Sequence, residues 1–234
     1  MKLEINEITP NITTLRKRVS DKRILVVTAV PVEKEAVLRG LRSDRSFDVL
    51  VGGVGPIAAA ANTAKVLATA EYGLVVSIGI GGGFPGRAEV GSLVVANEII
   101  VADLGAETPT GFSSLDDLGF GSTRIQVEAN LVNDLTEALL VAKLPVVTGS
   151  VLTVSTVTGT AESLAKLVAR VPGATAEAME GYGVAFAAND RGLPILELRA
   201  ISNLVGPRDR AAWRIKEALE VLEAASSVLL EVLL

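Results

Sequence analysis

Short apolar runs alternate with helical patterns along this chain, and no other feature of its sequence limits the possible folds as strongly. Strands that alternate with helices are typical of βαβ units and a parallel sheet. Several of the apolar runs are hydrophobic on both faces, as expected when helices cover both sides of a sheet. The sequence therefore predicts an α/β fold with a largely parallel, twisted central sheet flanked by helices. The expected strands are residues 24–30, 47–51, 74–78, 92–101, 146–154, 174–179 and 195–201, and the expected helices are residues 33–41, 56–70, 130–142, 162–170, 181–190 and a long segment from Arg210 onward.

The 234 residues of the chain are enough for one large domain. We assign residues 23–234 to this domain and interpret residues 1–22 as an N-terminal extension. The extension is polar and mixed in charge, without the apolar middle of a signal peptide, and no stretch of the chain approaches the ~20 apolar residues that a membrane span needs. A cytoplasmic protein without a membrane partner is expected. Residues 105–123, rich in Gly, Ser and Asp, form either a lid over a site or a surface loop.

The chain contains no cysteine and no histidine. Without cysteine, disulfides, thiol catalysis and thiolate metal sites are excluded. Without histidine, the commonest general base and metal ligand are missing as well. An enzyme of this composition depends on carboxylates, amides, hydroxyls and cations, and neither a metal nor an organic cofactor is implied. The net charge of −5 argues against a nucleic acid as partner.

Polar residues or glycines follow directly after five of the predicted strands. In an open parallel sheet, ligands bind beyond the carboxyl ends of the strands, and right-handed crossovers bring the chain back to the same side each time. We therefore expect these five segments to converge on one pocket that contains carboxylates, an amide, hydroxyls and glycines. The segments are residues 31–35, 79–83, 155–158, 180–181 and 202–203.

The residues of these segments have both structural and functional interpretations. Glu180, between small and apolar neighbours, is either a site carboxylate or the favoured acid at a helix N-terminus. Glu33 is either a helix-start acid or a base that activates water, and Glu35 is the alternative base. Asn203 suits a strand end, yet its amide can donate to one ligand atom and accept from another. Gly81 belongs to a glycine run that no helix follows, which favours a close backbone approach to a sugar or base over a dinucleotide fingerprint.

The two segments Ala178-Met179-Glu180-Gly181 and Arg199-Ala200-Ile201-Ser202-Asn203 carry a family resemblance. Together they resemble the paired signatures of the purine nucleoside phosphorylase/uridine phosphorylase superfamily, and more narrowly its nucleosidase branch, which contains methylthioadenosine/S-adenosylhomocysteine nucleosidase. The resemblance runs from about Arg23 to the C-terminus. It implies a nucleoside phosphorylase-like fold and a purine nucleoside as the small-molecule partner.

The resemblance also implies roles for individual residues. The residue that matches Glu180 holds the ribose hydroxyls, and the one that matches Glu33 orients or activates the attacking water. The residue that matches Asn203 contacts the N7 side of the purine and assists its departure, so Glu33 and Asn203 are implied as catalytic. These roles are chemically sensible, because glycosidic cleavage passes through an oxocarbenium-like sugar that carboxylates stabilise, and the leaving purine needs hydrogen-bond donors.

Two departures from the adenine-cleaving nucleosidases concern the base. Those enzymes have Asp at the position of Asn203 and a glutamate at the position of Ala178. A carboxylate suits the 6-amino group of adenine, whereas an amide can donate to a 6-oxopurine. The departures therefore favour a hypoxanthine nucleoside.

The segment from Ser202 to Trp213 resembles the futalosine hydrolases of this branch, which remove hypoxanthine from futalosine in the alternative menaquinone pathway. Futalosine carries a benzoate on its 5′ side, and Arg208 or Arg210 would supply a cation for it. Both arginines also fit a charged turn in which Asp209 caps the last helix. The substrate-binding residues that the resemblance implies are Glu180, Met179, Ser155, Val157, Gly81, Ser202 and Arg208.

Three alternatives stay open. Phosphorolysis competes with hydrolysis, but phosphate-using relatives usually have an arginine in the N-terminal turn, where this chain has the acidic Glu33, and Arg87 is the only cation nearby. A second alternative is another nucleoside, either inosine-like or methylthioadenosine/S-adenosylhomocysteine. A third, from a different class, is a nucleoside-binding protein without catalysis.

The end of the chain is strongly apolar. This segment either packs on the sheet or is covered by a second subunit, because exposed apolar patches are uncommon on monomers. We expect a homo-oligomer. The apolar residues are Leu219, Leu222, Val228, Leu229, Val232 and Leu233.

Overall fold

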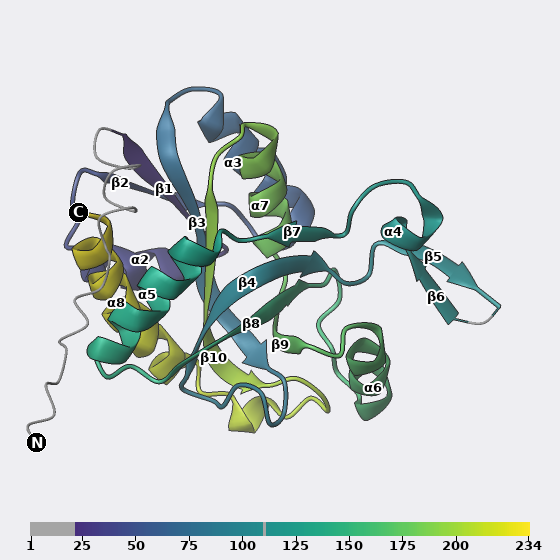
Figure 1. Cartoon of the computed structure of the whole chain (residues 1–234). Helices are drawn as coiled ribbons and strands as arrows, with labels where there is room; N and C mark the ends of the chain where they lie inside the picture. Colours follow the sequence, from purple (N-terminus) through teal and green to yellow (C-terminus); the bar gives the residue numbers. More distant parts are fainter. Residues whose placement is uncertain (1–21, 110) are drawn as a thin grey trace, which may run out of the picture.

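Eight strands form the central sheet of the computed structural model, which describes residues 22–109 and 111–234. Helices lie on both sides of this sheet, as the alternating pattern predicts (Figure 1). The predicted extension lies outside the described residues except for Lys22. The strands are β1 (Arg23–Thr28), β2 (Phe47–Val51), β3 (Tyr72–Gly83), β4 (Leu93–Val101), β7 (Arg124–Gln126), β8 (Val146–Thr153), β9 (Ala174–Ala178) and β10 (Ile195–Leu204). The helices are α2 (Pro31–Gly40), α3 (Pro56–Leu67), α4 (Leu115–Leu118), α5 (Ala129–Val141), α6 (Ala161–Arg170), α7 (Gly181–Asp190) and α8 (Ile215–Leu233), and a short 3-10 helix, η1 (Arg210–Ala212), precedes α8.

The sheet is mixed rather than largely parallel, which corrects the prediction. Strands β1, β2, β3 and β10 run in one direction, whereas β4, β8 and β9 run in the other. The direction reverses between β3 and β4, which residues 84–92 connect without a helix. A parallel crossover needs about a dozen residues or more, so this short connection cannot return the chain to the opposite end of the sheet. Because β10 pairs with both β3 and β4, strands β10, β4, β8, β9 and β3 close into a ring.

The predicted convergence of strand ends occurs, but by a different route. Strand β9 meets β3 only where both strands end, with Glu177 opposite Gly82 and Ala176 opposite Gly83. On its other side Gly82 pairs with Asn203 of β10. The carboxyl ends of strands with opposite directions therefore meet at the end of β3.

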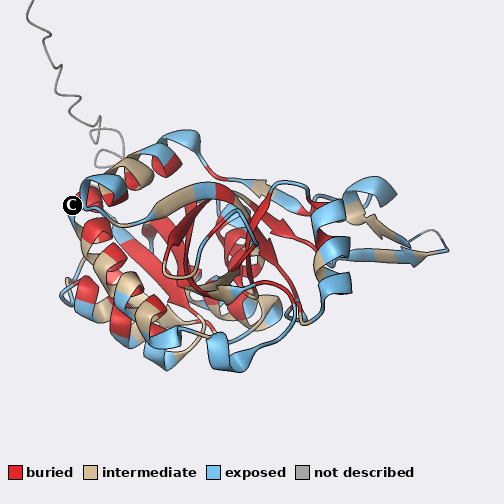
Figure 2. Cartoon of the chain, turned by 90° about the horizontal axis from the view of Figure 1, so that it is seen from below, coloured by how far each residue is buried: buried red, intermediate tan, exposed pale blue. Residues whose placement is uncertain are grey.

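The apolar C-terminal helix is covered within the chain. Helix α8 packs against α2 and α5 and against strands β3 and β10, and its apolar face is buried. In Figure 2 the buried residues lie on the sheet and on the helix faces turned toward it. The apolar end thus has a partner inside the chain, and the homo-oligomer stays a prediction that needs other support.

Residues 105–123 are more regular than the sequence predicts. They form a small hairpin of β5 (Gly105–Thr108) and β6 (Gly111–Ser114), followed by α4, which Ser114 caps at its N-terminus. This unit projects from the rest of the molecule (Figure 1). Whether it acts as a lid stays a prediction. Within the described part of the chain, no helix is long and apolar enough to cross a membrane.

Candidate active site

A cavity of about 230 Å³ lies where strands β1, β3, β9 and β10 end. It brings together most of the site residues that the sequence predicts. Two predicted residues do not line it: Ser155 is exposed and its backbone N–H donates to Asp103 at 2.6 Å, and Arg208 lines an adjoining cavity. The predicted residues that line this cavity are Glu33, Gly81, Val157, Met179, Glu180, Ser202 and Asn203.

Glu33 is held rigidly at the first turn of α2. Its Oε2 accepts hydrogen bonds from the backbone N–H groups of Ala29 (2.9 Å) and Val30 (3.2 Å), and its Oε1 accepts one from Ile80 (2.9 Å). Glu33 therefore caps the helix and also lines the cavity, so the two interpretations of this residue are compatible. Glu35, the alternative base, is exposed.

Burial raises the pKa of Glu33 above the usual value, although the three backbone donors and the nearby Arg199 act to lower it. A carboxylate with a raised pKa accepts a proton more readily. Glu33 is thus an oriented carboxylate that lines the cavity.

Glu180 precedes α7 but does not cap it with its side chain. Its Oε1 accepts a hydrogen bond from the backbone N–H of Gly55 at 3.1 Å, and its Oε2 accepts one from Met179 at 3.3 Å. The glycine-rich turn before α3 therefore supplies an amide to a site carboxylate. These contacts favour the interpretation of Glu180 as a site residue over that of a helix-start acid.

Arg199 links the carboxylates of the site, although from the sequence it had no predicted role beyond its place in a signature. It is 1% exposed; its Nε donates to Glu197 at 2.8 Å, and its guanidinium lies 3.5 Å from Glu180. Burial alone lowers the pKa of Arg199, but Glu197, Glu180 and Glu33 raise it above its usual value, so this cation stays charged. The sequence did contain a sign of this role: an arginine inside an apolar strand is buried, and a buried charge requires partners.

The glycine run of β3 makes room for this cluster. A Cβ atom at Gly79 would lie 2.7 Å from Oε1 of Glu33 and 2.9 Å from the guanidinium of Arg199. These close contacts are with protein side chains, and the close approach of a sugar or base to the glycine run stays a prediction.

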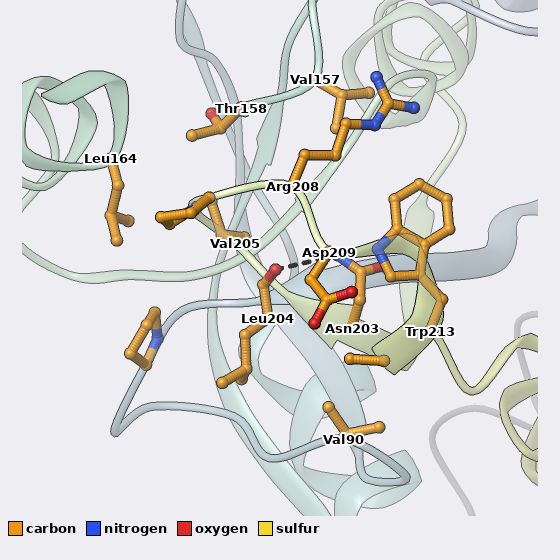
Figure 3. A pocket seen from close by; sticks show the side chains of 14 residues that line it. Val90, Val157, Thr158, Leu164, Asn203, Leu204, Val205, Arg208, Asp209 and Trp213 are labelled. Atoms are coloured by element: carbon orange, nitrogen blue, oxygen red, sulfur yellow. Dashed lines mark hydrogen bonds between the residues drawn. The ribbon is translucent and has the colours of Figure 1, made fainter. Parts of the chain in front are cut away.

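The amide of Asn203 is oriented by its neighbours. The Ser202 hydroxyl donates to Oδ1 of Asn203 at 2.9 Å. Nδ2 of Asn203 donates to the carbonyl of Leu204 at 3.0 Å (Figure 3). Because the NH₂ group has two N–H donors and one of them points to Leu204, the other is left for a ligand.

Glu177 is a second residue that the sequence analysis missed. It is 4% exposed and lines the same cavity as Glu33 and Glu180. Its Oε1 accepts a hydrogen bond from the backbone N–H of Thr158 at 2.9 Å, and its other oxygen accepts one from the Thr158 hydroxyl. The family resemblance concerns Ala178, one position further along. An acid inside an apolar strand nevertheless indicates a buried charge with a specific role.

The adjoining cavity, of about 380 Å³, shares Val157, Asn203 and Trp213 with the first. Arg208 extends beside it, with its guanidinium 5.4 Å from the centre of the Trp213 ring (Figure 3). Asp209 accepts a hydrogen bond from the backbone of Ala211 and so caps η1. The other residues that line the adjoining cavity are mostly apolar and include Val90, Leu164, Val205 and Pro207.

This arrangement suits a polar ligand with an apolar extension. Buried carboxylates can hold hydroxyls and water, and an amide can donate to a leaving group. The cavity that continues from them has a mostly apolar lining with Arg208 and Asp209 as its charged residues. In the described part of the chain, no group of three or more acidic side chains is placed to hold a metal ion.

Comparisons with known proteins identify relatives of this chain. The model of the phosphorylase superfamily matches residues 29–234. A futalosine hydrolase from Streptomyces coelicolor is 52% identical over 230 residues, covering 90% of this chain and 96% of that protein. A futalosine hydrolase from Acidothermus cellulolyticus is 47% identical, with 88% and 89% covered. The structure of a futalosine hydrolase from Helicobacter pylori has the same fold, with a TM-score of 0.76 at 18% identity, covering 91% of this chain and 97% of that one.

Proposed function

Because this chain belongs to the phosphorylase superfamily, we infer that it is a nucleosidase that hydrolyses the N-glycosidic bond of futalosine. The reaction uses water and releases hypoxanthine and dehypoxanthine futalosine, a step of the alternative menaquinone pathway. The observation that carries this function is the 52% identity to a futalosine hydrolase over 96% of that protein. The site geometry fits the same chemistry.

Glu180 binds the ribose. A carboxylate that accepts from Gly55 and Met179 retains lone pairs for the hydroxyls of a sugar. As the bond between C1′ and N9 breaks, the sugar becomes cationic, and the negative charges of Glu180 and Glu33 stabilise it. Arg199 offsets part of their repulsion while no substrate is bound.

Glu33 activates the water. Its carboxylate is fixed by three backbone donors, so the proton of a water molecule at C1′ can pass to it as the new C1′–O bond forms. The raised pKa of Glu33 favours this transfer. No phosphate is needed in this scheme.

Asn203 assists the departure of the base. The electron pair of the broken bond passes to the purine, and the remaining N–H of Asn203 donates to its N7 or O6 side. An amide donor suits the 6-oxo group of hypoxanthine better than the carboxylate of an adenine-cleaving enzyme. Substitution of Asn203 by Asp should therefore slow hypoxanthine release.

Arg208 receives the benzoate of futalosine in the adjoining cavity. The support is its place beside an apolar cavity and against Trp213. An aryl carboxylate matches such a surface, since the ring packs on apolar side chains and the charge meets a guanidinium.

A cytoplasmic location of the enzyme stays a prediction from the sequence alone.

The test follows release of free base from futalosine, inosine and methylthioadenosine, with and without phosphate. We expect hypoxanthine from futalosine at a rate that phosphate does not change. Glu33→Gln should retain futalosine binding and lose cleavage, whereas the matched variant of the exposed neighbour, Glu35→Gln, should remain active. Strict phosphate dependence would contradict hydrolysis, preferred release of adenine would contradict the choice of base, and a binder without activity would release no base at all.

A further inference from the structure

Glu177 has no part in the reaction as described, although it lines the same cavity as the groups that do. Both of its oxygens accept hydrogen bonds from Thr158, one from the backbone N–H and one from the hydroxyl. Within the described residues its carboxylate has no ion pair with a lysine or arginine, unlike Glu180. A carboxylate oxygen has two acceptor positions, so each oxygen of Glu177 can accept a further hydrogen bond from a ligand.

Glu177 and Asn203 lie on opposite sides of one glycine. Gly82 pairs with Glu177 of β9 and with Asn203 of β10. A Cβ atom at Gly82 would lie 3.0 Å from the side chain of Val205 and 3.3 Å from Nδ2 of Asn203, so the glycine keeps the space beside the amide open. Glu177 and Asn203 both line the cavity, which thus has an acceptor and a donor in its wall.

A 6-oxopurine carries the complementary pattern along its edge. Its O6 and N7 accept hydrogen bonds, and its N1–H donates one. Asn203 can donate to O6 or N7 but leaves the N1–H unmatched. A buried donor without an acceptor weakens binding, so a site for hypoxanthine needs an acceptor at this position.

We propose that Glu177 is a specificity-determining residue, whose carboxylate accepts the N1–H of the purine while Thr158 positions it. The proposal rests on the proposed function and names how that site selects its base. A 6-aminopurine has a lone pair at N1 and would direct it at the carboxylate. The backbone N–H of Thr158 cannot serve that lone pair, because it already donates to Glu177 at 2.9 Å.

The test compares base preference in wild type and Glu177→Gln. We would measure kcat/KM for release of base from futalosine and from its 6-amino counterpart. The oxygen of a glutamine at this position can still accept the backbone N–H of Thr158, whereas its NH₂ group would donate to the Thr158 hydroxyl and present a second N–H in place of an acceptor. The ratio of 6-oxo to 6-amino cleavage should fall about 10- to 100-fold, the range expected for one mismatched buried hydrogen bond. The control is Glu162→Gln, which changes an exposed acid of α6 and should leave the ratio unchanged.

A second measurement uses the wild-type protein and does not depend on how a variant folds. Calorimetry would compare binding of hypoxanthine and 1-methylhypoxanthine, which lacks the N1–H. We expect at least about tenfold weaker binding of the methylated base, and a smaller difference in Thr158→Val, where Glu177 loses one of its two contacts.

The outcomes separate the two proposals. If wild type cleaves futalosine but Glu177→Gln keeps the wild-type base ratio, or if both bases bind equally, the role of Glu177 is wrong and the proposed function stands. If wild type does not cleave futalosine, the proposed function fails, and the binding measurements still decide the role of Glu177. An equal loss of both activities with an unchanged ratio would mean that Glu177 only supports the Thr158 loop, which contradicts the proposal.

Discussion

Three buried carboxylates, those of Glu33, Glu180 and Glu197, lie around Arg199. Glu197 holds the guanidinium through its Nε, Glu180 lies 3.5 Å from it, and Glu33 interacts with it electrostatically. One positive charge therefore compensates up to three negative charges in a buried site, where charge–charge interactions are stronger than in water. This excess of negative charge becomes stabilising only when a cationic sugar forms beside it.

The first residue-scale prediction concerns the pH dependence of the reaction. Burial raises the pKa of Glu33, and the carboxyl group must be deprotonated to accept the proton of water. The kcat/KM should therefore fall as the pH decreases through this raised pKa, at a pH above the value of about 4 that is usual for carboxyl groups. The measurement is the pH profile of kcat/KM for futalosine, and Glu35→Gln should have the same profile. A rate that stays constant down to pH 4 would show that Glu33 is not the base.

The second residue-scale prediction concerns Arg208. Arg208→Gln should raise the KM for futalosine about threefold to tenfold, because an exposed charge pair contributes modestly. The KM for inosine, which has no benzoate, should not change, and added salt should reduce the difference. Arg210→Gln is the matched control, since Arg210 begins η1 and does not line the cavity. Equal changes in the KM for both substrates would show that Arg208 does not bind the benzoate.

At the scale of elements, helices and strands were predictable where a local pattern determines them. Helix α7 and strand β2 have the predicted bounds. Strand β3 was predicted to stop at Ile78 and continues to Gly83, since its glycines are held by pairing with β9 and β10 rather than by their own propensity. The hairpin of β5 and β6 was missed because short polar strands lack an alternating apolar pattern.

The packing of α3 against α7 gives a prediction at this scale. A Cβ atom at Gly183 would lie 2.1 Å from the carbonyl oxygen of Pro56, which is backbone and cannot move aside. Gly183→Ala should lower the free energy of unfolding by about 1 to 3 kcal/mol through overpacking. It should also raise the KM, because α7 follows Glu180 and α3 follows its partner Gly55.

Urea unfolding would measure this change against Gly173→Ala. A Cβ atom at Gly173 has no neighbour within 4 Å, so that variant should stay within about 0.5 kcal/mol of wild type. Equal stability of the two variants would contradict the close approach of the helices.

At the scale of the whole molecule, the sequence predicted the layers but not the direction of the strands. Each local unit, such as β8–α6–β9, is a parallel pair with a crossover helix, and a pattern of apolar runs detects it. The reversal between β3 and β4 depends on a connection too short for a crossover, and the ring depends on β10 reaching two partners. Such long-range pairing leaves no local signal. The site itself was largely predictable, because its residues follow strand ends, whereas the contacts of Glu177 and Arg199 required the fold.

The remaining whole-molecule prediction is the homo-oligomer. Because α8 is covered within the chain, this prediction now rests on other exposed apolar residues. Ile57 is 84% exposed, Phe120 80% and Phe186 57%. The centres of the Tyr182 and Phe186 rings lie 6.2 Å apart, and the Tyr182 hydroxyl donates to the carbonyl of Ser122, two residues from Phe120. Gly183 lies against Pro56, the neighbour of Ile57. Several exposed large apolar side chains in one region favour a protein interface.

We therefore expect light scattering after size exclusion to give a mass of at least twice the 24.2 kDa of the chain. The double variant Ile57→Asp with Phe186→Asp should shift this mass to that of a monomer, because two buried charges without partners destabilise an interface. Leu140→Asp is the matched control: it places the same charge at a 57% exposed leucine on α5 and should leave the mass unchanged. A wild-type protein that is monomeric at micromolar concentration would contradict the prediction. An oligomer that the double variant leaves intact would place the interface on another face of the molecule.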